Sequence, residues 1–378
     1  MSGDESKYKG RERHNPRSGM GRLRRANSKD TGRLSGWEQR AEDDEFLDRH
    51  AHQERRSHGG ESLLARFNRL AQHASAPTGT PGEICGFQGR QVVVRGADGQ
   101  ERVCEIRSVL KKQVAGVKNV LCVGDRVRIE TAPEPVITAI EPRRNQLERA
   151  DSHNRSLVHV FAANIDVLVI VAALREPDLK RGLIDRYLVL AAACDIPAVV
   201  VINKADLADP ADDAALYRAI GVPVFTTVGH QGGGDIDALR DHLRGKTCVV
   251  CGQSGVGKSS VINALHPGFQ ARVGAVADEG HGRHTTTSAR SVVLPDGGRL
   301  VDTPGIRECA VTGLKPLDVA LLMPDLARFH PRCRFADCSH LHEPDCAVWA
   351  AAEAGDIAVS RFESYRSIIQ EDLVERPS

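Results

Sequence analysis

A P-loop motif limits this chain to a small group of folds. Residues 252–259 read Gly-Gln-Ser-Gly-Val-Gly-Lys-Ser, the pattern of a glycine, four residues, then Gly-Lys-Ser. The strand-like run TCVVC precedes the motif and the helix-like run SSVINALH follows it, as the motif requires. In such a loop, glycines let backbone N–H groups surround a phosphate, and the helix N-terminus adds partial positive charge. The predicted nucleotide contacts are Gly252, Gln253, Ser254, Gly255, Val256, Gly257, Lys258, Ser259 and Ser260.

Side chains of the P-loop and of a second motif suit a nucleotide with its metal ion. Lys258 is expected to reach the β- and γ-phosphates, and Ser259 is expected to bind Mg²⁺. Asp302 opens an Asp-Thr-Pro-Gly motif after the strand-like run RLV, where its carboxylate can hold Mg²⁺ directly or through water. Gly305 closes that motif and is expected to offer its N–H to the γ-phosphate. The motif alone also fits a plain turn, but its position after a P-loop favours the nucleotide site.

A third motif, Asn-Lys-Ala-Asp at 203–206, selects the base. Asp206 can accept two hydrogen bonds from the N1 and N2 donors of guanine. Adenine cannot supply these donors, and an unpaired carboxylate would therefore reject ATP. Asn203 and Lys204 are expected to hold the neighbouring loop and to flank the base. The tetrapeptide is weak evidence alone, because strand-to-helix turns often look like it, but together the three motifs indicate GTP.

The motifs occur in a rotated order along the chain. They normally run P-loop, Asp-Thr-Pro-Gly, then Asn-Lys-x-Asp, whereas here the guanine motif comes first and Asp-Thr-Pro-Gly last. Apolar runs such as IDVLVIVAAL and PAVVVIN alternate with helix-like segments such as GLIDRYLVLAAACDI, which predicts a doubly wound α/β domain with a parallel sheet. The same sheet forms when a chain is cut and rejoined elsewhere, so we predict a circular permutation.

The N-terminal third differs from the rest of the chain in charge and in the pattern of its apolar residues. Residues 1–40 carry eleven Lys/Arg and five Asp/Glu, although the formal net charge of the whole chain is only +1. We interpret residues 1–80 as a basic, mostly disordered arm with one short helix near 63–70. Residues 81–142 hold short alternating runs separated by turn signals, which predicts a small barrel or sandwich; a five-stranded barrel of the oligonucleotide-binding type fits this length. Its many Lys/Arg suit phosphate contacts, although such residues are more often plain solvated surface.

A glycine-rich segment at 280–287, Gly-His-Gly-Arg-His-Thr-Thr-Thr, has the features of a nucleotide-sensing switch. Its threonines can bring a hydroxyl to Mg²⁺ and sense the γ-phosphate; Thr286 is the favoured ligand and Thr285 the alternative. His284 is a candidate to position or activate the attacking water. Ile306 stands where Ras-like enzymes carry a water-orienting glutamine, which predicts slow intrinsic hydrolysis. The catalytic candidates are Lys258, His284 and Thr286.

Three cysteines and a histidine crowd together near the C-terminus. Cys333, Cys338, His340 and Cys346 offer three thiolates and one imidazole, which complete a closed tetrahedral zinc site and leave no open position for catalysis. His330 and His342 lie close in sequence and compete with His340 for the fourth position. The remaining cysteines are scattered, as ordinary buried residues are. We therefore predict one structural Zn²⁺ per chain.

These features together resemble the circularly permuted GTPases and, more narrowly, the bacterial GTPase family that depends on the small ribosomal subunit. The resemblance is carried by the motif order, the small barrel before the GTPase part, the stretch AANIDVLVIVAAL…GLIDRYLVLA, the 280–287 segment and the spacing Cys333-x4-Cys338-x-His340-x5-Cys346. It favours His340 as the fourth zinc ligand. It covers residues 81–375. It implies an OB-like barrel (81–145), a permuted GTPase domain (146–314) and a helical zinc-binding domain (315–378), which follow the basic arm (1–80).

The resemblance also implies a function. A member of this family hydrolyses GTP to GDP and phosphate with Mg²⁺, is stimulated by the small (30S) ribosomal subunit, and acts in late maturation of that subunit while binding 16S rRNA. No apolar run reaches the roughly 20 residues that span a bilayer, and the first residues lack an apolar signal-peptide core, so we expect a cytoplasmic protein with no membrane contact. Nothing in the sequence points to an obligate oligomer, so we expect a monomer.

Two alternatives stay open at this point. The first is an RNA- and zinc-binding assembly factor whose guanine-nucleotide switch is nearly inactive. The missing water-orienting glutamine supports this alternative. The second is a P-loop ATPase or small-molecule kinase, against which the Asn-Lys-Ala-Asp motif argues. The nucleotide preference of the purified protein distinguishes the second alternative from a GTPase.

Overall fold

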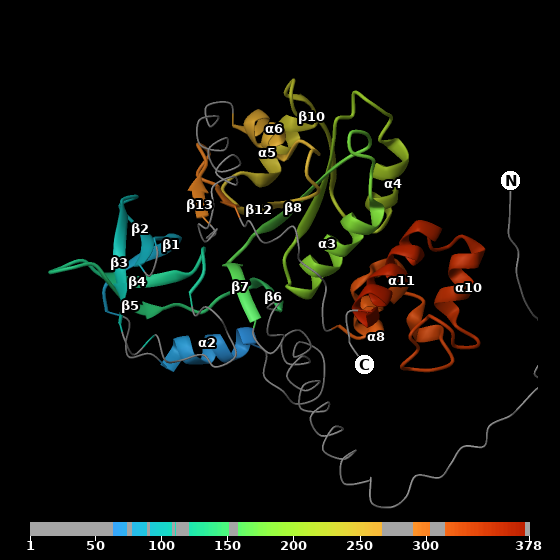
Figure 1. The fold of residues 1–378 in the computed structure, drawn as a ribbon, viewed down its shortest axis with the longest axis horizontal. Helices are drawn as coiled ribbons and strands as arrows, with labels where there is room; N and C mark the ends of the chain where they lie inside the picture. Colours follow the sequence, from blue (N-terminus) through green and yellow to red (C-terminus); the bar gives the residue numbers. More distant parts are fainter. Residues whose placement is uncertain are drawn as a thin grey trace, which may run out of the picture. The chain divides into compact units, whose positions relative to one another are not determined.

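The computed structural model describes residues 63–73, 78–88, 91–107, 110, 121–150, 158–266, 290–302 and 314–374 (Figure 1). All of these belong to one compact unit, Glu45–Ser378. The predictions for most of the N-terminal arm, for the 280–287 segment with His284 and Thr286, and for Gly305 lie outside the described residues. Within the described ranges, no helix is both long enough and apolar enough to cross a membrane.

The first domain is a closed five-stranded barrel, as predicted. Apolar side chains alternate along its strands and form one core, which includes Ile84, Val92, Val94, Val127 and Ile137. Strand β1 pairs antiparallel with β2 and β4, and the third strand pairs parallel with the fifth, which gives the order β1-β2-β3-β5-β4 and closes the barrel. The strands are β1 (Thr80–Gln88), β2 (Gln91–Gly96), β3 (Glu101–Ile106), β4 (Arg126–Glu130) and β5 (Val136–Ile140).

The arginines on the barrel strands are largely paired with acidic side chains. Arg95 lies 2.6 Å from Glu101, and Arg128 lies 2.8 Å from Glu141. Two further pairs are Arg102–Asp98 and Arg107–Glu130. Sequence alone suggested a surface of basic residues for phosphate contacts. The structure gives several of these arginines a carboxylate partner, which reduces the positive field that they present.

The central domain is built on a seven-stranded sheet in the order β11-β10-β9-β8-β12-β14-β13. The five inner strands run parallel, and both edge strands are antiparallel to their neighbours. Strand β8 is buried along its whole length, as its unbroken apolar run predicts. The strands are β8 (Val167–Ala173), β9 (Ala198–Asn203), β10 (Val224–Val228), β11 (Gly233–Gly234), β12 (Thr247–Cys251), β13 (Arg290–Val293) and β14 (Arg299–Asp302).

Two separate apolar layers cover this sheet. Side chains that alternate along β8 and β9 divide between them: Ile170 and Ile202 belong to the layer with α3 (Arg181–Ala193), whereas Val169 and Val201 belong to the layer with α5 (Ile236–Leu243) and α6 (Lys258–Leu265). Helix α4 (Ala211–Ala219) packs beside β10. This is the predicted doubly wound fold. Strand β12, which leads into the P-loop, pairs with β8, and the paired residues (Cys248 with Val167, for example) are 81 positions apart in the chain, as the rotated motif order demands.

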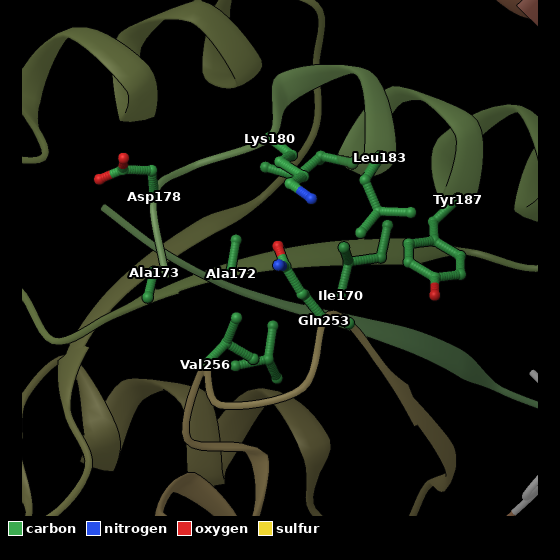
Figure 2. A pocket seen from close by; sticks show the side chains of 12 residues that line it. Ile170, Ala172, Ala173, Asp178, Lys180, Leu183, Tyr187, Gln253 and Val256 are labelled. Atoms are coloured by element: carbon green, nitrogen blue, oxygen red, sulfur yellow. The ribbon is translucent and has the colours of Figure 1, made fainter. Parts of the chain in front are cut away.

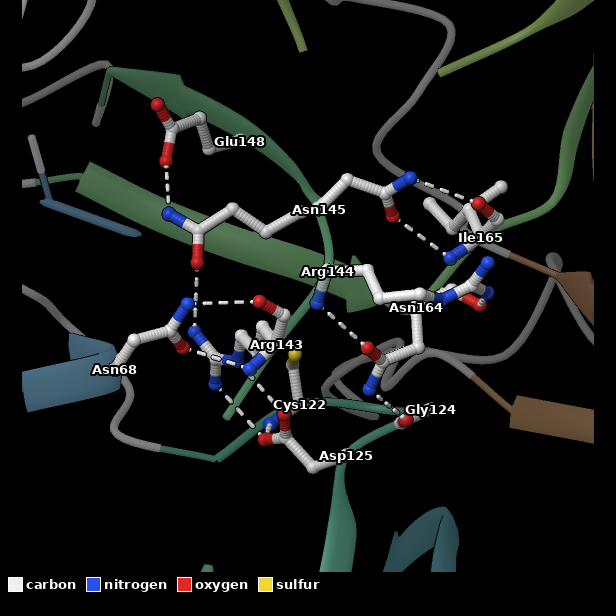
Figure 3. Close-up of polar contacts among 11 residues, drawn as sticks. Asn68, Cys122, Gly124, Asp125, Arg143, Arg144, Asn145, Glu148, Asn164 and Ile165 are labelled. Carbon is white, nitrogen blue, oxygen red and sulfur yellow. Dashed lines mark hydrogen bonds and ion pairs between the residues drawn. The ribbon is translucent and has the colours of Figure 1, made fainter. Parts of the chain in front are cut away.

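A buried polar network joins the barrel to the GTPase part of the chain (Figure 3). Arg143 makes two hydrogen bonds of 2.7 and 2.8 Å to Asp125, and both side chains are almost fully buried. The Arg143 guanidinium also lies 3.6 Å from the ring centre of Phe67, on helix α2 (Leu63–His73), while Asn68 bonds the backbone of Arg143 in both directions. Asn164 donates to Gly124 across the same junction. An antiparallel pair, β6 (Gln146–Ala150) and β7 (Val158–Ala163), follows.

The C-terminal region is helical, and a buried arginine ties it to the GTPase part. Arg361 donates to Asp185 on α3 at 2.6 Å and makes two bonds of 2.9 Å to Asp325. Its side chain is 2% exposed, and α11 packs along α3 (Figure 1). The elements are α8 (Pro316–Leu322), α9 (Pro324–Ala327), the 3-10 turn η5 (His330–Arg332), α10 (Ala347–Ala354) and α11 (Val359–Val374).

Candidate nucleotide site and metal centre

The P-loop connects β12 to α6 with three left-handed glycines. Gly252, Gly255 and Gly257 have φ values of 137°, 85° and 89°. A Cβ at Gly252 would collide with the carbonyl oxygen of Val171, and a Cβ at Gly257 would collide with the side-chain nitrogen of Asn203. Glycine is therefore required here for two reasons, the backbone conformation and the close approach of neighbouring groups.

Asn203 joins the guanine motif to the P-loop. Its Nδ2 donates to the carbonyl of Val256 at 2.9 Å, and its Oδ1 accepts from Thr227 Oγ1 at 3.0 Å and from Gly229 N at 2.9 Å. The asparagine is 2% exposed. One buried side chain thus joins the guanine motif, the P-loop and the end of β10.

Both lysines of the motifs bond backbone carbonyls. Lys258 Nζ donates to Gly252 O at 3.0 Å and to Gln253 O at 2.8 Å, so its ammonium group lies over the loop that is expected to carry phosphate. Lys204, which has a left-handed φ of 57°, donates through Nζ to the carbonyl of Glu176. The two cations therefore lie against the P-loop and against the loop after β8.

The other predicted contacts that the structure describes lie at one edge of the sheet. Strands β9, β12 and β14 are parallel members of one sheet, and the guanine motif, the P-loop and Asp302 stand at their carboxyl ends. Ligands of doubly wound sheets bind outside this edge. Asp206, Ser254 and Ser259 are exposed there, and Ser260 is half-buried. Asp302 is placed by its backbone, which pairs with Arg290.

A small pocket lies between the P-loop and the start of α3 (Figure 2). Gln253 and Val256 of the P-loop form one side of it, and Lys180 and Leu183 form the side that faces them. Ile170 of β8 also lines it. The P-loop is thus in contact range of α3, the helix whose Asp185 binds Arg361.

The four predicted zinc ligands converge. The ligand atoms of Cys333, Cys338, His340 and Cys346 all lie within 4.8 Å of one another. His340 Nδ1 is 3.3 Å from Cys346 Sγ and 3.7 Å from Cys333 Sγ, and these two sulfurs are 4.0 Å apart. Tetrahedral Zn²⁺ with bonds of about 2.3 Å to sulfur and about 2.0 Å to nitrogen separates its ligand atoms by about 3.5–3.8 Å. The donor set and its spacing fit Zn²⁺.

Burial shapes the protonation of this cluster. It raises the pKa of the Cys338 thiol to about 12 and also raises the pKa of the Cys346 thiol. Burial and, to a smaller extent, the neighbouring His330 lower the pKa of His340 to about 4. This imidazole is therefore neutral at pH 7 and offers a lone pair. A metal ion has to displace the thiol protons when it binds. His342 is exposed and stands outside the converging group.

Several residues that hold the site together could not be identified from the sequence. Glu176 acts through its backbone carbonyl, which no residue-type motif reveals. Thr227, near the end of β10, is fully buried and bonds Asn203. Arg361 lies 176 residues from its partner Asp185, too far for any local pattern to connect them. Helix α11 carries two arginines, Arg361 and Arg366, and residue type alone does not show which of them is buried.

Comparisons with known proteins agree with this geometry. A family model described as RsgA GTPase matches residues 140–312. A Gemmatimonas aurantiaca protein named small ribosomal subunit biogenesis GTPase RsgA is 41% identical over 296 residues, which cover 76% of this chain and 96% of that protein. A Porphyromonas gingivalis protein of the same name is 37% identical over 302 residues, with coverage of 76% and 96%.

Two solved structures share the architecture. The crystal structure of YjeQ from Thermotoga maritima superposes with a TM-score of 0.63 at 30% identity and covers 79% of this chain and 99% of that one. The crystal structure of YloQ, described as a circularly permuted GTPase, gives a TM-score of 0.61 at 28% identity, with coverage of 81% and 98%. With its barrel, its permuted P-loop domain and its Cys/His cluster, this chain belongs to the RsgA GTPase family.

Proposed function

We propose that this protein binds GTP with Mg²⁺ and hydrolyses it to GDP and phosphate. The observation that carries the proposal is the Asn203 side chain, which bonds the P-loop and the Thr227–Gly229 loop at the same time. The guanine motif and the phosphate-binding loop are therefore parts of one site. Asp206 reads guanine, the loop from Gly252 to Ser260 surrounds the phosphates, and Lys258 neutralises the β- and γ-phosphate charge.

The magnesium ligands and the switch complete this proposal. Ser259, Asp302 and Thr286 hold Mg²⁺, Gly305 binds the γ-phosphate, and His284 positions the attacking water. The exposure of Ser259 at the N-terminus of α6 suits a residue that meets a metal–nucleotide complex from solvent. A nearly inactive guanine switch on an RNA- and zinc-binding factor is the alternative function, and it is favoured by Ile306 in place of a water-orienting glutamine.

Nucleotide turnover tests the proposed activity. Purified protein with Mg²⁺ should release phosphate from GTP and not from ATP. A Lys258→Ala variant should lose about 10²–10³-fold in the rate constant, because one preorganised donor to developing charge contributes that much. A Lys246→Ala variant, which changes a lysine at the opposite end of β12, is the matched control and should keep the wild-type rate. Equal turnover of ATP and GTP would contradict the proposal.

We also propose that the Cys/His cluster holds one structural Zn²⁺. Three thiolates and one imidazole leave no open position, so the ion stabilises the fold of the C-terminal region and takes no part in hydrolysis. Metal analysis of protein purified without added zinc should find about one zinc per chain, the capacity of one four-ligand site. A well-folded sample free of zinc would refute this assignment. A Cys346→Ser variant should lose the metal, and a Cys251→Ser variant, outside the cluster, should keep it.

We propose that the partner is the small ribosomal subunit. The barrel would contact 16S rRNA, and the protein would bind as a monomer. Relatives at 41% and 37% identity carry small ribosomal subunit biogenesis in their names. We further propose the division into arm (1–80), barrel (81–145), GTPase domain (146–314) and zinc-binding domain (315–378). GTP binding and hydrolysis would switch the affinity for the subunit during its late maturation.

A further inference from the structure

The two ring nitrogens of His340 face different neighbours. Its Nδ1 lies 3.3 Å from Cys346 Sγ and 3.7 Å from Cys333 Sγ, inside the group of metal ligands. Its Nε2, on the far side of the ring, lies 3.3 Å from Nδ1 of His330. The metal-facing atom of His340 is therefore Nδ1, and the histidine that the sequence offered as a competing ligand stands behind the ring.

This arrangement creates a need for a hydrogen-bond acceptor. A neutral imidazole that gives its Nδ1 lone pair to a metal carries its proton on Nε2. His340 is fully buried, so water does not reach this N–H, and a buried donor without an acceptor is strongly unfavourable. The contact that the structure provides for Nε2 is His330 Nδ1. Metal-bound histidines generally donate their second ring N–H in this way, which fixes the tautomer and the ring orientation.

We propose that His330 is a positioning residue for the metal: its Nδ1 accepts a hydrogen bond from His340 Nε2–H and aims His340 Nδ1 at the ion. The inference rests on the proposed zinc site and goes beyond its four ligands. It gives His330 a role other than that of the competing ligand that the sequence left open.

The surroundings of the two rings support this role. The His330 and His340 ring planes meet at 79° with their centres 5.2 Å apart, and the two facing nitrogens lie 3.3 Å from each other, within hydrogen-bond distance. His330 belongs to the turn η5, and its carbonyl accepts from Cys333 N at 3.0 Å, which ties it to the first zinc ligand. On another side the Tyr365 ring centre lies 6.0 Å from that of His340, and the Tyr365 hydroxyl donates to Ser339 O.

Zinc affinity of three variants tests the proposal. In a competition with a chromophoric chelator, His330→Phe, which keeps a ring and loses the acceptor, should bind zinc about 10–100-fold more weakly than wild type. His330→Asn should stay near wild type, because its Oδ1 acceptor stands in the position of Nδ1. His342→Phe removes the exposed histidine of the same region and should change nothing. Wild-type affinity of His330→Phe, or an equal loss in His330→Asn, would overturn the proposal.

Two measurements keep the test independent of variant folding and of the zinc assignment. Ring-nitrogen NMR of the unsubstituted protein should show His340 with metal on Nδ1 and a proton on Nε2, and His330 protonated on Nε2 alone. A proton on His330 Nδ1 would overturn the proposal. In the cobalt-substituted protein, His330→Phe should keep the thiolate-to-cobalt bands of wild type, whereas altered bands would make His330 a ligand instead. Absence of zinc from wild-type protein would refute the zinc site itself, which metal analysis detects separately.

Discussion

Replacing Asp206 by asparagine should lower the affinity for GTP and GDP by about 10²–10⁴-fold, because each of two hydrogen bonds to a charged acceptor contributes about 1.5–3 kcal/mol. The carboxylate is exposed at the carboxyl edge of the sheet, beside the loop that Asn203 ties to the P-loop, so it is free to meet a base. An asparagine amide would also turn a donor toward the N2 donor of guanine. Equilibrium binding of a fluorescent GTP analogue measures the change.

A change of nucleotide should restore tight binding to the same variant. Xanthine carries an oxygen where guanine carries its 2-amino group, so the new amide donor finds an acceptor, and xanthosine triphosphate should bind the variant better than GTP does. Asp212→Asn is the matched control, since Asp212 is exposed on α4 outside the motif. Unchanged GTP affinity in Asp206→Asn would remove base recognition from this residue, and an equal loss in the control would show that the effect is one of net charge.

Replacing Arg361 by methionine should destabilise the C-terminal helices by about 3–5 kcal/mol, because it leaves two carboxylates in the interior without their cation. Asp185 is fully buried and Asp325 is 8% exposed. Arg361 bonds both of them, and it therefore links α11 to α3 and α9. Urea unfolding followed by Trp349 fluorescence reports on this region, in a Trp37→Phe background that removes the second tryptophan.

The pH dependence of this loss has a predicted sign. Burial raises the pKa of Asp185 even with Arg361 present, and removing the cation raises that pKa further. An acid whose pKa is higher in the folded state than in the unfolded state opposes folding above the unfolded value, increasingly so until the folded pKa is passed. The deficit of Arg361→Met relative to wild type should thus be smaller at pH 5 than at pH 8.

An exposed ion pair serves as the control for Arg361. Arg334 and Asp345 lie 3.0 Å apart with side chains 61% and 69% exposed, so Arg334→Met should change stability by only about 0–1 kcal/mol. Similar losses in both variants would mean that burial of the Arg361 network contributes little. A loss in Arg361→Met that is independent of pH would contradict the claim that uncompensated carboxylates cause it.

The parts of this protein that follow local rules were predictable from sequence. The alternation of apolar residues predicted the barrel strands, the unbroken apolar runs predicted β8 and β9, and the glycine spacing predicted the turn between β12 and α6. The spacing of three cysteines and a histidine predicted a cluster whose atoms converge. Each of these signals lies within a short segment, where residue type and periodicity determine the structure directly.

The parts that depend on contacts between distant segments were not predictable. Arg143 and Asp125 are 18 residues apart, and both residue types also suit a solvated surface. The Phe67 ring against Arg143 comes from helix α2, before the barrel. The pairing of Arg95 and Arg128 with acids on the barrel depends on strand register, which alternation alone does not give. The ring nitrogen that His340 turns to the thiolates, and the position of His330 behind that ring, depend on side-chain direction, which spacing does not encode.

The central claim is that this chain is a GTPase whose hydrolysis rate is raised by the small ribosomal subunit. The initial rate of phosphate release from GTP, measured with and without purified small subunits, tests it most directly. We predict slow turnover by the protein alone, because Ile306 replaces the water-orienting glutamine, and a sharp rise when small subunits are added, with large subunits as the control. Turnover that is the same with and without small subunits would contradict the account.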